Sequence, residues 1–115
     1  MAYDHYLEDR ITQVLKSLNV NFMPKKMMGG LVFMVNGKMC CGIHIDKTSG
    51  NNILMLRLGE TIYQEEIHKE YCKPMDFTGR PMKGYLFVTP AGFDLDDDLM
   101  YWLRRALTFN STLTK

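Results

Sequence analysis

The chain has 115 residues, of which 46% are hydrophobic and 23% charged, and its net charge is +1. This balance is typical of a globular domain, and it provides no electrostatic footprint for nucleic acid or a membrane surface. No apolar run approaches the roughly 20 residues that span a bilayer, and the polar N-terminus does not resemble a secretion signal. We therefore expect one cytoplasmic domain over residues 1–115, with no membrane contact.

The first predicted element is an amphipathic helix near the N-terminus. Asp4 is a favourable N-cap residue, and Asn19 is a typical stop signal. Apolar residues recur between them at helical spacing, at Leu7, Ile11, Val14, Leu15 and Leu18. This stripe predicts a helix that buries one face.

The strongest local pattern is a β-hairpin in the first half of the chain. Leu31–Val35 and Lys38–Ile45 are β-type runs, and Asn36-Gly37 lies between them. A type I′ turn needs positive φ at both central residues, which Asn and Gly tolerate best. The pattern therefore predicts two antiparallel strands joined by a two-residue turn.

The predicted turn also indicates which side chains share a face of the sheet. A two-residue turn pairs Phe33 with Cys40, and strict alternation then divides the side chains into two sets. One set is apolar and is expected to pack on helices: Val32, Met34, Met39, Cys41, Ile43, Ile45, Leu54, Leu56 and Leu58. The other set is mixed and is expected to stay partly open: Leu31, Phe33, Val35, Lys38, Cys40, Gly42, His44, Ile53, Met55 and Arg57.

The second half of the chain continues with shorter elements. A third strand over Ile53–Leu58 precedes a short helix over Glu60–Lys69. Proline and glycine then predict an ordered loop before a fourth strand, Tyr85–Thr89, and a last helix is capped by Asp94 or Asp96. The predicted order is α-β-β-β-α-β-α. Tight hairpins favour an α+β fold with an antiparallel sheet of about four strands and flanking helices.

The sulfur-containing residues form no recognisable metal or disulfide motif. Cys40 and Cys41 are adjacent and Cys72 is isolated, so we expect three reduced thiols. A structural zinc site needs a second ligand pair, and beyond His44 only His68 and Cys72 remain. The ten methionines lack close Met-x-x-Met clustering and are interpreted as core filler. We therefore expect no metal and no cofactor.

Four segments stand out in chain order: KKMMGGLVFMVNGKMCCGI, ILMLRLGE, PMDFTGRPMKGYLFVTPAGF and DLMYWLRRAL. Together they resemble the TfoX N-terminal domain family, over a range from Met1 to about Phe109. The resemblance implies an α+β fold with helices flanking an antiparallel sheet. It also implies a regulatory role, because the family is named for a regulator of bacterial natural competence. Two departures are Met28, where the family usually has an aromatic residue, and the regulator's second domain, which these residues do not match.

Six polar side chains are candidates for binding a ligand or partner: Lys26, His44, Arg57, Asp76, Arg80 and Lys83. His44 and Arg57 fall on the mixed face of the predicted sheet, and an apolar floor with few polar groups is typical of ligand pockets. In the 73–83 loop, Arg80 and Lys83 favour an anionic group. Alternatively, Asp76 pairs with Arg80 and only fixes the loop.

The sequence predicts no catalytic constellation, so we expect a protein that is not an enzyme. The first hypothesis is a regulatory or interaction module that binds a protein partner or a small anionic ligand, as a monomer or a homodimer. The alternative is a nucleic-acid-associated regulator related to competence control, with Lys25, Lys26, Arg80 and Lys83 as phosphate contacts. An enzymatic role would require titratable groups that converge from separate loops.

The predicted turn can be tested directly. Gly37→Val forces a β-branched residue to positive φ, so we expect the free energy of unfolding to fall by roughly 1–3 kcal/mol. Urea denaturation followed by circular dichroism measures this change. An unchanged denaturation midpoint would show that the hairpin prediction is wrong.

Overall fold

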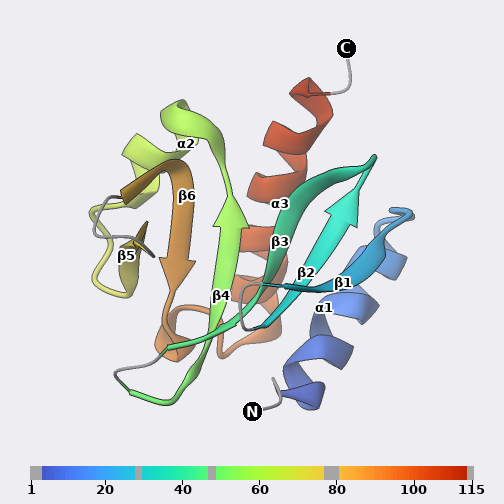
Figure 1. Cartoon of the computed structure of the whole chain (residues 1–115), viewed down its shortest axis with the longest axis horizontal. Coiled ribbons are helices and arrows are strands. Elements are labelled where there is room, and N and C mark those ends of the chain that lie inside the picture. The colour runs from blue at the N-terminus through green and yellow to red at the C-terminus, as the bar shows by residue number, and fades with distance from the viewer. Residues whose placement is uncertain (1–3, 28–29, 47–48, 77–80, 114–115) are drawn as a thin grey trace.

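The computed structural model describes residues 4–27, 30–46, 49–76 and 81–113. These residues contain three α-helices and six β-strands (Figure 1). In chain order the elements are α1 (His5–Ser17), β1 (Met23–Met27), β2 (Gly30–Val35), β3 (Lys38–Ile45), β4 (Asn52–Arg57), α2 (Gly59–Glu66), β5 (Cys72–Asp76), β6 (Pro81–Val88), the short 3-10 helix η1 (Pro90–Gly92) and α3 (Asp96–Thr112).

The predicted α+β class is confirmed, with helices against an antiparallel sheet. The strand order is β1-β2-β3-β4-β6-β5, and all neighbouring strands are antiparallel. The sheet has six strands instead of about four, because β1 and β5 were not predicted. Both are edge strands with a proline, Pro24 and Pro74, and neither shows alternating apolar residues. The predicted 73–83 loop therefore contains most of β5 and the start of β6.

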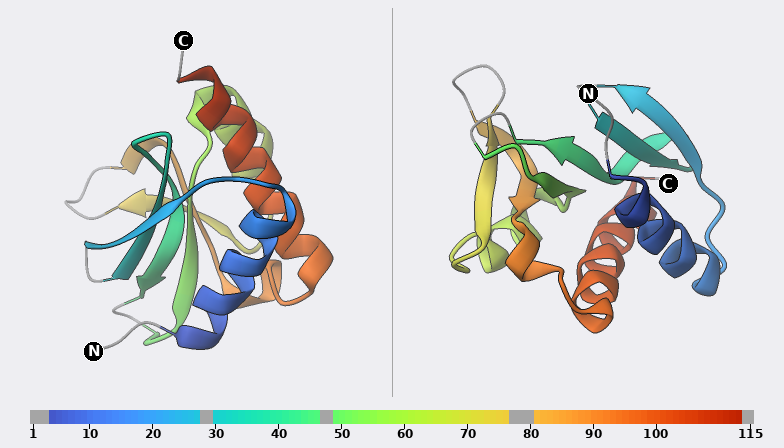
Figure 2. Two further views of the ribbon diagram at one scale, coloured as in Figure 1. Left: turned by 90° about the vertical axis from the view of Figure 1, so that its right-hand side faces the viewer. Right: turned by 90° about the horizontal axis from the view of Figure 1, so that it is seen from below.

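The helices α1 and α3 lie side by side on one face of the sheet, and α2 packs against β6 (Figures 1 and 2). Asp4 caps α1 as predicted, since its side chain accepts a hydrogen bond from the Tyr6 amide at 2.9 Å. The apolar stripes of α1 and α3 are buried, at Leu7, Ile11, Leu15, Leu99, Trp102, Leu103 and Ala106. Within the described residues, no helix is long and apolar enough to cross a membrane.

The hairpin turn is confirmed, but the register predicted beyond it is wrong. Asn36 and Gly37 have φ values of 55° and 76°, positive at both central positions. The register then shifts between Met34 and Phe33. Met34 pairs with Met39, but Phe33 pairs with Cys41 instead of Cys40. Such a β-bulge inserts one extra residue, which strict alternation cannot reveal.

The bulge changes the face on which several side chains lie. The odd-numbered residues of β2 belong to the core beneath the helices, and the even-numbered ones lie on the opposite face. The residues that depart from the predicted faces are Leu31, Val32, Phe33, Met34, Val35, Met39 and Cys40. The strand β4 follows the prediction, because its helix-side residues are Leu54, Leu56 and, just beyond its end, Leu58.

The face without helices contains a second apolar core. Five side chains at its centre are at most 5% exposed: Val32, Ile53, Met55, Met75 and Phe87. These residues and the half-buried ones packed around them all come from strands. This face, which was expected to be partly open, is closed at its centre. The first four residues of β1, at its rim, are exposed.

Two glycines allow the sheet to curl and enclose this second core. A Cβ atom on Gly42 would lie 2.4 Å from the Leu31 carbonyl oxygen, and one on Gly30 would lie 1.9 Å from the Ile43 carbonyl oxygen. Only a residue without a side chain permits this approach of β2 and β3. Figure 2 shows β1 and β5 extending away from α1 and α3, so the outer strands flank the helix-free face.

The close approach of β2 and β3 predicts a difference between two glycine substitutions. Gly42→Ala places a methyl group against backbone, and we expect the free energy of unfolding to fall by about 3 kcal/mol. Gly37→Ala, at a turn with open space around it, is expected to cost about 1 kcal/mol from its positive φ alone. Urea denaturation measures the free energy of unfolding of both variants. Equal losses of stability would contradict the predicted difference.

Candidate functional site

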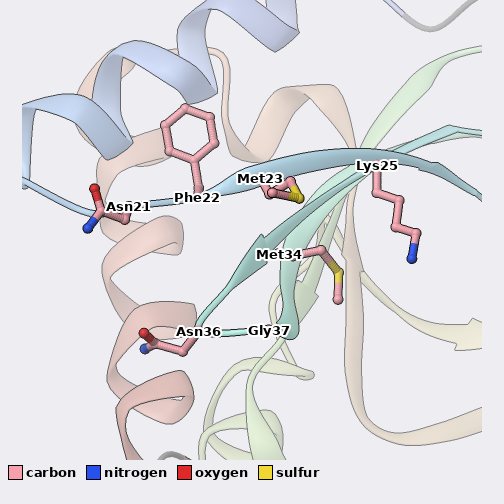
Figure 3. Close-up of a pocket in the computed structure, with 7 residues that line it drawn as sticks. All are labelled: Asn21, Phe22, Met23, Lys25, Met34, Asn36 and Gly37. Carbon is pink, nitrogen blue, oxygen red and sulfur yellow. The ribbon is translucent and has the colours of Figure 1, made fainter.

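A groove with a volume of about 450 Å³ lies between the start of β1 and the turn that joins β2 to β3 (Figure 3). The residues that line it come from the lead into β1, from β1 and β2, and from the turn: Asn21, Phe22, Met23, Lys25, Met34, Asn36 and Gly37. Six of these seven residues were not among the binding candidates or phosphate contacts predicted from the sequence.

The groove lies where β1 no longer pairs with β2 but β2 still pairs with β3. Pairing of β1 with β2 ends at Met23 and Met34, whereas pairing of β2 with β3 continues to Val35. The chain before Met23 therefore separates from the turn. The wall at the turn is fixed, because Asn36 Nδ2 donates to the side-chain oxygen of Asn110 at 3.2 Å. Asn110 is 2% exposed and donates in turn to the Val35 carbonyl oxygen at 3.1 Å.

The groove combines an apolar wall with one cation. The Phe22 ring is turned toward the helix-side core, with its centroid 5.7 Å from that of Phe33. Figure 3 shows Met34 and Lys25 projecting on the other side of the strands. Within the described part of the chain, Lys25 forms no ion pair. Its ammonium group is therefore available to an anion in or beside the groove.

The candidate residues on the neighbouring strands β3 and β4 lie toward opposite ends of β4. His44 pairs with Ile53, and its ring stacks on Phe87 with centroids 4.9 Å apart and an interplanar angle of 6°. Arg57 lies four residues further along β4. Its guanidinium carbon is 5.5 Å from the centroid of the Tyr85 ring.

Lys83 and Lys26, the two other candidates whose side chains are described, lie on different strands. Lys83 is 87% exposed and lies 3.9 Å from a carboxylate oxygen of Glu60, which is a weak surface ion pair. Lys26 pairs with Leu31 and so lies on the opposite face of β1 from Lys25. The Asp76 side chain and the whole of Arg80 lie outside the described residues. The four candidates whose side chains the structure describes, Lys26, His44, Arg57 and Lys83, are therefore not gathered into one site.

A buried charge lies between α2 and α3, and it was not predicted from the sequence. Glu66 is 2% exposed; its Oε1 atom lies 2.6 Å from Lys69 Nζ, and its Oε2 atom accepts from Arg105 Nε at 3.0 Å. The Tyr101 hydroxyl also donates to Oε2. Burial by itself raises the pKa of Glu66, but hydrogen bonds from Lys69 and Tyr101, with the charges of Lys69 and Arg105, outweigh it and lower the pKa below its usual 4.5. The Glu-x-x-Lys spacing on a short helix was the one sequence signal for this cluster.

The three cysteines are free thiols, and the pKa values of Cys41 and Cys72 are raised. Cys40 and Cys41 are at most 1% exposed. Burial and, to a smaller extent, the charge of Glu66 raise the pKa of Cys72 to about 11. Across the described residues, no three His, Cys, Asp or Glu side chains gather as ligands for a metal ion.

The fold and the groove define a small α+β module built on one curled antiparallel sheet. The chain belongs to the TfoX N-terminal domain family, whose family model matches residues 15–110. The expected resemblance is thus confirmed over most of the chain. The family is not a known family of enzymes, and it supports a regulatory module related to competence control. Searches of curated proteins and of solved structures found no match.

The buried carboxylate predicts a specific pH dependence of stability. Because the pKa of Glu66 is lowered by folding, its charge stabilises the fold above about pH 4.5, and this contribution is lost as the pH falls through the folded-state pKa. Glu66→Gln is expected to lower the free energy of unfolding by about 1–3 kcal/mol at pH 7. At pH 2.5 the difference in the free energy of unfolding between Glu66→Gln and wild type should be smaller. Urea titrations at both pH values test this, with Glu65→Gln, at an exposed carboxylate, as the control; a gap that does not change with pH would contradict it.

Proposed function

We propose that this chain is a regulatory binding module that recognises a small organic anion with an apolar body in the groove beside β1. The observation that carries the proposal is the position of Lys25, a cation without an ion-pair partner in the described residues, at a cavity walled by Met23 and Met34. An ammonium group beside an apolar wall matches a ligand with a charged end and an apolar body.

The dimensions and polar groups of the groove favour a small ligand. Its volume of about 450 Å³ falls within the range of ordinary small-molecule pockets. Lys25 supplies a charge-assisted hydrogen bond to a carboxylate or sulfonate oxygen. The amides of Asn21 and Asn36 supply further donors and acceptors.

The hydrogen bonds around the turn support a regulatory consequence of binding. Asn36 lines the groove and also donates to Asn110 near the end of α3. A ligand that engages the Asn36 amide competes with this bond. Occupancy of the groove is then coupled to the contact between the turn and α3, which a partner can sense.

The nucleic-acid alternative fits the positions of the lysines less well. Phosphate contacts need cations along one surface. Lys25 and Lys26 lie on opposite faces of β1, and Lys83 lies on β6 beside Glu60. We therefore base the proposal on the single cation at the groove.

The proposal is tested with 8-anilinonaphthalene-1-sulfonate, an anion with an aromatic body. We expect one binding site, measured by fluorescence titration, and we expect Lys25→Met to raise the Kd about tenfold, since a charged hydrogen bond contributes roughly 1.5 kcal/mol. Lys26→Met is the matched control, because it removes the same charge from the other face of the same strand. Near-ultraviolet circular dichroism of Trp102 verifies that the variants and the dye complex stay folded.

Two outcomes would overturn the proposal. The first is equal affinity of the dye for wild type and Lys25→Met. The second is an equal loss of affinity in both lysine variants, which would show that net charge, and not the position of Lys25, determines binding. Salt-sensitive binding of duplex DNA at micromolar protein, measured by fluorescence anisotropy, would favour the nucleic-acid alternative instead.

A further inference from the structure

Three methionines form a row across neighbouring strands on the helix-free face. Met23 pairs directly with Met34, and Met34 pairs directly with Met39. Side chains at directly paired positions lie on the same face, with Cβ atoms roughly 5 Å apart. The row runs from β1 through β2 to β3, and its first two members line the groove. The spacing of these methionines along the chain gave no sign of this row.

Exposure differs sharply among the methionines of this face. The Met23 side chain is 68% exposed, and Met34 and Met39 are half-buried. Met55 and Met75, in the second core, are at most 3% exposed. An oxidant in solution therefore reaches the row at the groove first and the second core last.

We propose that this row is a methionine oxidation site through which a hydroperoxide controls occupancy of the groove, an inference that rests on the proposed function. The thioether sulfur attacks the outer peroxide oxygen, the O–O bond breaks and an S–O bond forms. The sulfur loses two electrons, and the leaving oxygen takes up a proton to become water or an alcohol. The product is methionine sulfoxide, which thiol-dependent sulfoxide reductases return to methionine.

The chemistry of the groove gives this modification an effect on binding. Met23 and Met34 form the apolar wall against which the body of the ligand packs. A sulfoxide converts a flexible apolar side chain into a polar one, so the wall loses its affinity for apolar groups. The cation at Lys25 is unaffected, so oxidation weakens the apolar contacts and leaves the charged contact in place.

The cysteines do not compete effectively for the same oxidant. Peroxide reacts with the thiolate form of cysteine. Cys40 and Cys41 are buried in the helix-side core, and burial raises the pKa of Cys72 to about 11. Among the described sulfur atoms on the helix-free face, that of Met23 belongs to the most exposed side chain.

The first part of the test measures oxidation without any ligand. The folded protein is treated with hydrogen peroxide, quenched, digested with trypsin and mapped by mass spectrometry. Met23 and Met55 are each the only methionine of their tryptic peptides, residues 17–25 and 48–57. We expect Met23 sulfoxide to form at least about tenfold faster than Met55 sulfoxide, and methionine sulfoxide reductases to reverse it. Equal rates in protein that remains folded would overturn the oxidation site.

The second part measures the effect on the groove with 8-anilinonaphthalene-1-sulfonate. We expect oxidised wild type to bind the dye at least about threefold more weakly, and reductase treatment to restore binding. The double variant Met23→Leu with Met34→Leu has no sulfur in the wall, and its own Kd for the dye before peroxide treatment is the reference. Peroxide should leave that Kd unchanged, because the variant lacks the thioethers that form sulfoxides at the groove. Equal sensitivity of this variant and wild type would overturn the proposed control of occupancy.

The two proposals fail in distinguishable ways. Binding of the dye that does not depend on Lys25 in unoxidised protein rejects the proposed function, whatever the oxidation map shows. Binding that depends on Lys25 but is unchanged by oxidation of Met23 and Met34 rejects the further inference and leaves the proposed function intact.

Discussion

The close approach of β2 and β3 determines how the rest of this domain is built. Gly30 and Gly42 leave no side chain between the two strands, so the sheet curls away from the helices. Strands alone can then bury Met55, Phe87 and their neighbours, because the described residues of this second core all belong to strands. A flat sheet of the same length would leave that face in water, and the 115-residue chain would need another layer to cover it. The curl also determines which part of the face stays accessible, namely the rim at β1 where the groove lies.

Both outer strands are protected against pairing with another chain. Pro24 in β1 and Pro74 in β5 each remove a backbone donor from an edge of the sheet. Lysines beside them, Lys25 and Lys73, add charge, which further discourages strand addition. Under the proposed function, recognition at β1 therefore depends on side chains and not on a continued ladder of backbone hydrogen bonds. This agrees with a pocket for a small molecule better than with a site for an extended peptide.

The sequence predicted two features that depend on local chemistry, but the predicted cap of the last helix by Asp94 or Asp96 was wrong, because Leu95 lies at the N-cap of α3. The Asn36-Gly37 turn follows from the φ values that only a few residues tolerate, and the cap at Asp4 follows from its side-chain oxygen. The bulge at Cys40 was missed because pattern analysis assumes strict alternation, and β1 was missed because a short edge strand with a proline has no alternation to detect. The groove could not be predicted without β1 and the hairpin register. It forms where pairing of β1 with β2 ends and the hairpin continues, and this relation between strands is not encoded in any single segment.

The division of the interior into two cores means that the domain need not open as one unit. Strand β1 has one hydrogen-bonded neighbour, and its first four residues are exposed. Segments with few buried contacts open locally at a small fraction of the free energy of global unfolding. Amide hydrogens in β1 should therefore exchange with solvent long before those of β3 and β4, which lie between the two cores. The wall of the groove can then detach and re-form while the helix-side core remains intact. Under the proposed function, the affinity for a ligand will therefore reflect the local stability of one edge strand.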